Sequence, residues 1–285
     1  MSDAMEMIRE WCGDKKVLGC GVPLASAAGR VEYCRIGADI GPAWDNRALA
    51  VFNLRERIST RNSLHSTISR RSFSRRAFLN DPDVYMLRKE KSKLNEDQKH
   101  SLFLLNMALG DLVFTSDDLN NYDPPTLRKY QSQFPHFYKE TQSIFQVGDT
   151  YTIRFTCRNL HYLLLANLSG RKDEYELPKG KYYNQYLGFI EGGKVVLKPH
   201  QSRVFLKITD DKQLILGSTG HLFPGLEVDL VKWKADGLNM VRHALALPDG
   251  EVLVRVPEET GTTVMNKGTV KNVEEALGMR YIRAY

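Results

Sequence analysis

The 285-residue chain is long enough for one large domain or two of ordinary size, and its 42% hydrophobic content suffices for a folded core. Its 40 Lys and Arg against 34 Asp and Glu give a formal charge of +6, too mild to indicate nucleic-acid binding by itself. The first residues lack the pattern of a secretory signal, and no apolar run approaches about 18 residues. We therefore expect a cytoplasmic protein with no membrane partner.

The first 135 residues alternate between helical and strand-like segments. A helical face occupies residues 4–11, and strand-like runs follow near residues 17–24, 31–36, 77–86 and 112–116. Helices are expected over residues 46–69, after Asn95, which forms a capping-box pattern with Gln98, and after Asp123, which precedes a proline. Short apolar strands that alternate with helices predict a parallel sheet with both faces covered.

Each of these expected strands ends in a polar or tight-turn sequence. The four ends read CGVP, RIGAD, NDPD and TSDD. In such folds, functional residues lie at the carboxyl ends of the strands. A purely structural explanation is open for three of them: an ion pair between Arg35 and Asp39, a turn at NDPD, and a helix cap at SDDL. Taken together, they predict a pocket rich in hydrogen-bond acceptors, of the kind that suits sugar hydroxyls.

The rest of the chain is rich in β-structure. Its apolar runs are broken by Gly, Asp and Pro, which indicates antiparallel strands, and helical periodicity returns only in VEEALG, residues 273–278. We therefore expect an α/β region over residues 1–135, an antiparallel β-domain over residues 136–210, and an additional β-rich region over residues 211–285.

Cysteines and basic residues give weaker signals. Four cysteines occur without a CxxC or any metal-ligand spacing, and Cys20 and Cys34 lie in apolar stretches, which favours buried free thiols over a disulfide. Twelve Lys and Arg against four Asp and Glu lie from Arg47 to Lys93. A nucleic-acid patch is one interpretation, and a solvated helix face or a surface for an acidic partner is the other. Since no groove-reading motif accompanies the cluster, we expect no nucleic-acid partner.

The strand-end sequences resemble those of a known family. LGCGVPLASAAGRVEYCRIGADIGPAWD, RAFLNDPDVYMLRKEKSKL and LVFTSDDL are similar to the α-galactosidases of glycoside hydrolase family 36 and, more distantly, family 27. The resemblance implies strands five to eight of a (β/α)8 barrel, followed by an antiparallel β-sandwich-like domain. It also implies a retaining glycosidase that hydrolyses α-galactosides, a chemistry that needs no metal and no organic cofactor.

The resemblance also implies roles for individual residues. Asp39 matches the general acid/base of the family's R-x-x-x-D motif, and Arg35 matches the substrate-binding arginine of that motif. Cys20 and Gly21 match the CGxP sequence that lines the sugar site. Asp83 matches the second Asp of the NDPD sequence, which faces the same pocket.

The family's nucleophile, an Asp in a K-x-D motif on the fourth barrel strand, has no counterpart among the nineteen residues before Cys20. Lys234-Ala235-Asp236 imitates that motif, but Asp236-Gly237 is a common hairpin turn. We therefore expect half an active site, inactive as this chain alone. Three explanations stay open: a truncated gene product, one part of a split enzyme whose other chain supplies strands one to four, or a non-catalytic carbohydrate-binding or interaction protein.

Overall fold

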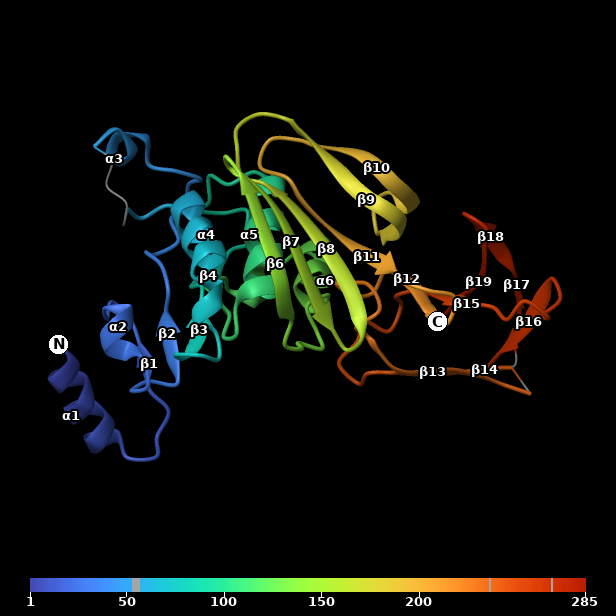
Figure 1. The fold of residues 1–285 in the computed structure, drawn as a ribbon, viewed down its shortest axis with the longest axis horizontal. Coiled ribbons are helices and arrows are strands. Elements are labelled where there is room, and N and C mark those ends of the chain that lie inside the picture. Colours follow the sequence, from blue (N-terminus) through green and yellow to red (C-terminus); the bar gives the residue numbers. More distant parts are fainter. Residues whose placement is uncertain (53–56, 236, 268) are drawn as a thin grey trace. The chain divides into compact units, whose positions relative to one another are not determined.

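The chain forms two compact units in the computed structural model, Met1–Tyr122 and Asp123–Tyr285 (Figure 1). The structure describes residues 1–52, 57–235, 237–267 and 269–285. Unit 1 holds helices and short parallel strands, and unit 2 is almost entirely antiparallel β-structure. Within the described ranges, no helix has the length and apolar character needed to cross a membrane.

In unit 1, helices alternate with strands of two or three residues. In chain order the described elements, with η for a 3₁₀ helix, are α1 (Ser2–Cys12), β1 (Leu18–Gly19), α2 (Leu24–Ala27), β2 (Tyr33–Arg35), α3 (Arg47–Val51), α4 (Thr60–Ser69), η1 (Arg71–Phe73), β3 (Leu79–Asp81), β4 (Val84–Tyr85), α5 (Glu96–Leu109), β5 (Phe114–Thr115) and η2 (Leu119–Asn121).

The strands of unit 1 pair in parallel, which confirms the prediction drawn from their alternation with helices. β1, β2 and β3 form one sheet in that order, and β4 pairs with β5. The single strand expected over residues 77–86 is interrupted between β3 and β4. Pro82 donates no backbone hydrogen bond, and Asp83 has a φ of 77°, outside the extended conformation.

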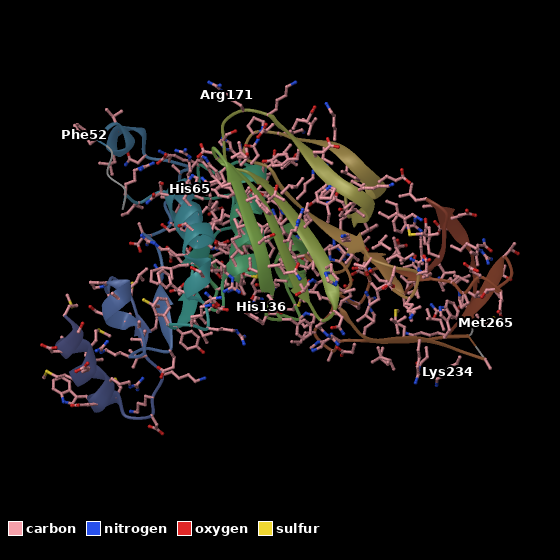
Figure 2. The ribbon with its side chains drawn as sticks, viewed as in Figure 1. Phe52, His65, His136, Arg171, Lys234 and Met265 are labelled. Carbon is pink, nitrogen blue, oxygen red and sulfur yellow. The ribbon has the colours of Figure 1, made fainter. Side chains whose placement is uncertain are left out.

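The long helical stretch expected over residues 46–69 contains two helices. α3 ends at Val51, and residues 53–56 lie outside the described part of the chain. α4 begins at Thr60 because the Ser59 hydroxyl accepts a hydrogen bond of 3.0 Å from the amide of Asn62. This helix, on which His65 lies (Figure 2), buries the short polar side chains of Ser63, Ser66 and Thr67. Such short side chains let neighbouring loops approach the helix closely.

α5 begins with the predicted capping box. The side chain of Asn95 accepts a hydrogen bond from the amide of Gln98, and the side chain of Gln98 accepts one from the amide of Asn95. Residues 101–109 are all buried, so this helix lies in the interior of unit 1. A second cluster joins α1 to the parallel sheet through Met5, Ala27, Val31, Cys34, Ile36 and Phe78.

Unit 2 opens with a short helix, whose N-terminus is capped by Asp123 as predicted. The described elements are α6 (Pro124–Gln131), β6 (Glu140–Val147), β7 (Thr150–Cys157), β8 (Leu160–Asn167), β9 (Asp173–Asn184), β10 (Gly188–Leu197), β11 (Ser202–Ile208), β12 (Ile215–Ser218), β13 (Val228–Lys234), β14 (Gly237–Arg242), β15 (Val252–Arg255), β16 (Thr263–Asn266), β17 (Thr269–Asn272), β18 (Glu274–Ala276) and β19 (Met279–Ala284).

Three larger sheets make up unit 2. One has six strands in the order β10-β9-β11-β8-β7-β6, and two have four strands each, β12-β15-β19-β18 and β13-β14-β16-β17. Neighbouring strands run antiparallel apart from the pairing of β14 with β16. Apolar residues of both four-stranded sheets share one core, which makes this set of sheets sandwich-like.

The helical pattern noted at residues 273–278 does not produce a helix. Glu274–Ala276 forms β18, and Leu277 and Gly278, with φ of 52° and 69°, connect it to β19. Positive φ at both central residues is the geometry of a two-residue hairpin. Pairing with β19 therefore outweighs the modest helical propensity of these six residues.

Close packing at Gly217 gives a test of the unit 2 core. A Cβ atom on Gly217 would lie 2.5 Å from the ring of Tyr183, whose side chain is buried. We expect Gly217→Ala to lower the free energy of unfolding by about 1–3 kcal/mol or more, because the ring has no free space to move into. Gly261→Ala, where nothing lies within 4 Å, is the matched control in urea unfolding. Equal stability of the two variants would contradict the described packing.

A buried carboxyl in unit 2 predicts a dependence of stability on pH. Glu227 is fully buried; its Oε2 accepts a hydrogen bond from the amide of Gly225, and its Oε1 has no partner among the described residues. Burial raises the pKa of Glu227, against the opposing effects of Ser218 and Arg242. Its contribution to stability is therefore full below the unfolded pKa of about 4.3 and is lost as the pH rises through the raised folded value.

Replacement of Glu227 by glutamine should remove this dependence. We expect the unfolding free energy of Glu227→Gln, measured relative to that of the unsubstituted protein by urea unfolding, to increase as the pH rises from 4 to 8. A difference in unfolding free energy that stays constant with pH would contradict the assignment.

Candidate active site

The carboxyl ends of three neighbouring parallel strands lead into the loops that carry the predicted site residues. β1 is followed by Cys20 and Gly21, β2 ends at Arg35 and is followed by the loop with Asp39, and β3 is followed by Pro82 and Asp83. The parallel register pairs Arg35 with Asp81. The strand order therefore brings together side chains that are distant in the sequence, such as Arg35 with Asp81 and Asp83.

Arg35 lies between three carboxylates. Its Nε donates a hydrogen bond of 2.9 Å to Asp81 Oδ2, and its Nη1 lies 2.9 Å from Asp83 Oδ1 and 3.2 Å from Asp39 Oδ1. Its Nη2 has no partner among the described residues. Burial by itself lowers the pKa of Arg35, but the hydrogen bond to Asp81 and the charges of Asp81 and Asp83 outweigh it and raise the pKa. The guanidinium is thus charged and fixed in orientation, with one nitrogen left to donate.

The three carboxylates differ in their access to solvent. The Asp39 side chain is 67% exposed, whereas that of Asp83 is 8% exposed and that of Asp81 is fully buried. Burial raises the pKa of Asp83, against the opposing effects of the Ile40 amide and the Arg35 charge. Asp39 is therefore the carboxylate of this cluster that a ligand in solvent can reach.

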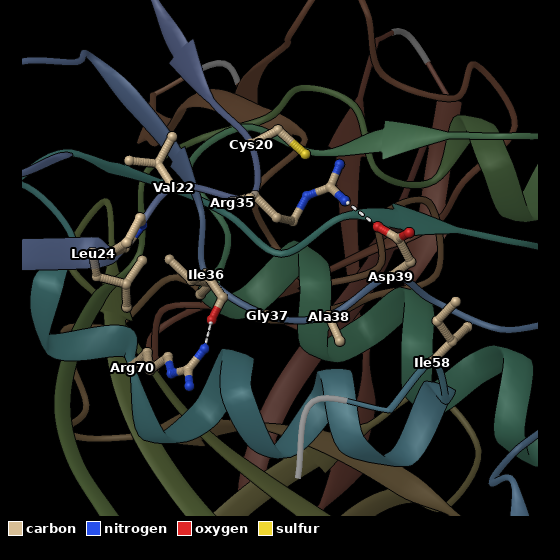
Figure 3. A pocket seen from close by; sticks show the side chains of 12 residues that line it. Cys20, Val22, Leu24, Arg35, Ile36, Gly37, Ala38, Asp39, Ile58 and Arg70 are labelled. Carbon is tan, nitrogen blue, oxygen red and sulfur yellow. Dashed lines mark hydrogen bonds and ion pairs between the residues drawn. The ribbon is translucent and has the colours of Figure 1, made fainter. Parts of the chain in front are cut away.

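A cavity of about 690 Å³ opens beside this cluster (Figure 3). Arg35 and Asp39 point toward one another at its edge, and Cys20 lies next to the guanidinium. The described residues that line it are Cys20, Gly21, Val22, Pro23, Leu24, Arg35, Ile36, Gly37, Ala38, Asp39, Ile58 and Arg70. Four of the five predicted site residues thus line one cavity, whereas Asp83 contacts Arg35 and is not among the lining residues.

Sequence reasoning missed Asp81, which it treated only as part of a turn. Asp81 Oδ2 accepts from Arg35 Nε, and its Oδ1 accepts a hydrogen bond of 2.8 Å from the amide of Asp83. Asp83 Oδ2 in turn accepts one of 2.6 Å from the amide of Ile40, the residue after Asp39. The alignment of β2 with β3 was the missing signal, because it is the register that places Asp81 beside Arg35.

The NDPD turn is held in place by α5. Asn106 donates a hydrogen bond of 3.3 Å to the carbonyl of Val84, just after the turn. A Cβ atom on Gly110, at the end of α5, would lie 2.7 Å from the ring of Pro82. A residue without a side chain is therefore required where the turn contacts the end of the helix.

The loop that carries Asp39 is bound to α4 along its length. Arg70 donates to the carbonyl of Ile36, and Thr60 Oγ1 donates to the carbonyl of Gly41 at 2.9 Å. Near the end of the loop, the amide of Arg61 donates to the carbonyl of Trp44 at 2.8 Å. These hydrogen bonds hold the loop on both sides of Asp39.

Several residues of the basic cluster have internal partners. Arg57 donates hydrogen bonds of 2.8 and 2.9 Å to the two carboxylate oxygens of Asp45, and Arg61 lies 3.3 Å from the same carboxylate. Arg88 binds the buried Asp117 at 3.0 Å. These contacts give the charges a structural role in the loops around the cavity.

The remaining sequence expectations have mixed outcomes. All four cysteines are free, as expected. Cys34 is buried, and this burial raises its pKa to about 11. The prediction that Cys20 is buried is wrong, because Cys20 is exposed and lines the cavity. Asp118 caps η2, as the structural explanation of SDDL predicts. β13 and β14 form the expected hairpin, while Asp236 lies outside the described residues. Among the described side chains, no group of three or more His, Cys, Asp or Glu is arranged to hold a metal.

Solved structures of glycosidases share the fold of this chain. The α-galactosidase I of Mortierella vinacea matches with a TM-score of 0.58 and 12% identity, over 73% of this chain and 63% of that one. A family 27 β-L-arabinopyranosidase of Geobacillus stearothermophilus, solved in complex with arabinose, matches with a TM-score of 0.57 and 13% identity, over 73% and 55%. No protein-family model matches the chain.

The chain spans about half to just under two thirds of the length of these two proteins. Its mostly β architecture, with few helices and a sandwich-like set of sheets, fits a partial glycosidase fold. At 12% and 13% sequence identity, this similarity is evidence for a shared fold alone.

The pair of Asp45 with Arg57 predicts a further pH effect. The hydrogen bond from Arg57 is the main cause that lowers the pKa of Asp45 to about 2. The stabilisation is present in full above the unfolded pKa of about 3.9 and is lost as the pH falls through the folded value. We expect Asp45→Asn to cost at most about 2 kcal/mol at pH 7 and nothing below pH 2, as measured by denaturant unfolding of the two proteins. A cost that persists at the lowest pH would contradict the ion pair.

Proposed function

We propose that this chain is the acid/base-carrying part of a retaining α-galactosidase, resembling family 36 in its motifs and corresponding to strands five to eight of the barrel with the following β-domain. The observation that carries the proposal is a solvent-accessible carboxylate, Asp39, held by Arg35 at the mouth of a cavity after a parallel strand. The fold shared with α-galactosidase I supports it.

The geometry suits the acid/base role in both steps of a retaining glycosidase reaction. Asp39 in its protonated form donates a proton to the glycosidic oxygen as the leaving group departs, and in the second step the resulting carboxylate removes a proton from the attacking water. Arg35 Nη2 is free to donate to a sugar hydroxyl because Asp81 and Asp83 occupy the other donors. Cys20 and Gly21 line the same cavity and complete the proposed sugar site.

The proposal requires a second carboxylate that acts as the nucleophile. In retaining enzymes the two carboxyl groups lie about 5 Å apart, on either side of the scissile bond. Among the described residues that line the cavity, Asp39 is the single carboxylate. We therefore propose that strands one to four of the barrel, on another chain or another part of the same protein, supply the second one.

A non-catalytic carbohydrate-binding or interaction protein is the second candidate. The observation that favours it is the same lone carboxylate, since a single acid can bind a sugar hydroxyl without cleaving the glycoside. This candidate predicts weak galactose binding that depends on Arg35 and Asp83, with no turnover after any complementation.

Complementation separates the two candidates. We expect an aryl α-galactoside to be cleaved by the chain mixed with a separately expressed strand-one-to-four half of a close relative, and not by the chain alone. Asp39→Asn should lower the activity of the mixture about 10²- to 10⁴-fold on a substrate with a poor leaving group, which needs protonation.

Asp3→Asn, on the exposed face of α1, is the control and should retain activity. Full activity of Asp39→Asn on that poor substrate would overturn the acid/base assignment. Galactose binding by the chain, without turnover in the mixture, would favour the second candidate.

A further inference from the structure

Asp83 uses both of its carboxylate oxygens within the protein. Its Oδ1 lies 2.9 Å from Arg35 Nη1, and its Oδ2 accepts a hydrogen bond of 2.6 Å from the amide of Ile40. The side chain is 8% exposed and is not among the described residues that line the cavity. A carboxylate with this geometry has little capacity left for a ligand.

Both partners of Asp83 adjoin Asp39. Ile40 is the next residue in the chain, and Arg35 Nη1 also contacts Asp39 Oδ1 at 3.2 Å. One carboxylate therefore restrains Asp39 from two sides, through its backbone and through its side-chain partner. Elsewhere in the loop, Arg70 binds the carbonyl of Ile36 and Thr60 binds that of Gly41, and neither contact reaches Asp39 itself.

The position of Asp83 is fixed independently of any ligand. Its amide donates to Asp81 Oδ1 at 2.8 Å, and the other oxygen of Asp81 accepts from Arg35 Nε. The φ of 77° at Asp83 lies in the left-handed region, which aspartate tolerates better than most residues. The turn between β3 and β4 thus aims the carboxylate at the Asp39 loop.

We propose that Asp83 is a positioning residue for Asp39, bridging Arg35 and the Ile40 amide, and is not a sugar ligand. The inference rests on the proposed function in that it assigns Asp39 the reacting role. Its structural content, the restraint of the Asp39 loop by Asp83, is measurable without turnover.

Amide hydrogen exchange at Ile40 in the full chain is the first test. Asp83→Gly removes the carboxylate and tolerates the positive φ, so we expect exchange at Ile40 to rise about tenfold or more. Asp83→Asn keeps an oxygen acceptor but loses the charge, and its exchange should rise less. Asp118→Gly, which removes a carboxylate bound only to Asn120 and Asn121 among the described residues, should leave Ile40 unchanged. Unchanged exchange at Ile40 in Asp83→Gly would overturn the proposal.

Kinetics of the complemented enzyme give the second test. A positioning role predicts that Asp83→Asn lowers kcat on a poor-leaving-group galactoside with little change in KM, whereas a sugar ligand predicts a raised KM at unchanged kcat. The second result would overturn the proposal. If complementation yields no activity, the proposed function fails, and the exchange experiment still decides whether Asp83 restrains the loop.

Discussion

The charged cluster around Arg35 is the interaction on which the rest of the site depends. A carboxylate as deeply buried as that of Asp81 is costly unless a cation and further hydrogen-bond donors satisfy it, and Arg35 and the amide of Asp83 do so. Because the pair joins β2 to β3, it also fixes which loop residues meet beyond the strand ends. Loss of the guanidinium would leave two largely buried carboxylates facing each other without a counter-charge.

Around this cluster, unit 1 holds a long loop through hydrogen bonds from α4 and from Arg70, the residue that follows it. The loop after β2 has almost no regular structure of its own, yet its carbonyls are bound at Ile36, Gly41 and Trp44. Proton transfer benefits from a donor whose position is set before the substrate arrives, because less ordering is required in the reaction itself. The contacts that order this loop all lie within unit 1.

Much of this arrangement follows from sequence patterns that act over short distances. The capping box at Asn95, the parallel strands with polar ends, and the adjacency of Arg35 and Asp39 each depend on residues a few positions apart. The role of Asp81 was not predictable in the same way, because NDPD reads equally well as a turn and only the register with β2 decides. The predicted burial of Cys20 and the helical pattern at residues 273–278 were wrong for a similar reason. An apolar neighbourhood in the sequence says little about which side of a loop faces solvent, and strand pairing outweighed local helical preference.

The contact between Gly110 and Pro82 extends the site beyond its charged residues. Gly110 lies at the end of a buried helix and has no group that could touch a sugar, but the ring of Pro82 occupies the space that its side chain would need. Any larger residue there would push the turn, and with it both of the carboxylates that hold Arg35. Among relatives, Gly110 should therefore be substituted as rarely as Arg35, although glycine has no side chain that could take part in binding or catalysis.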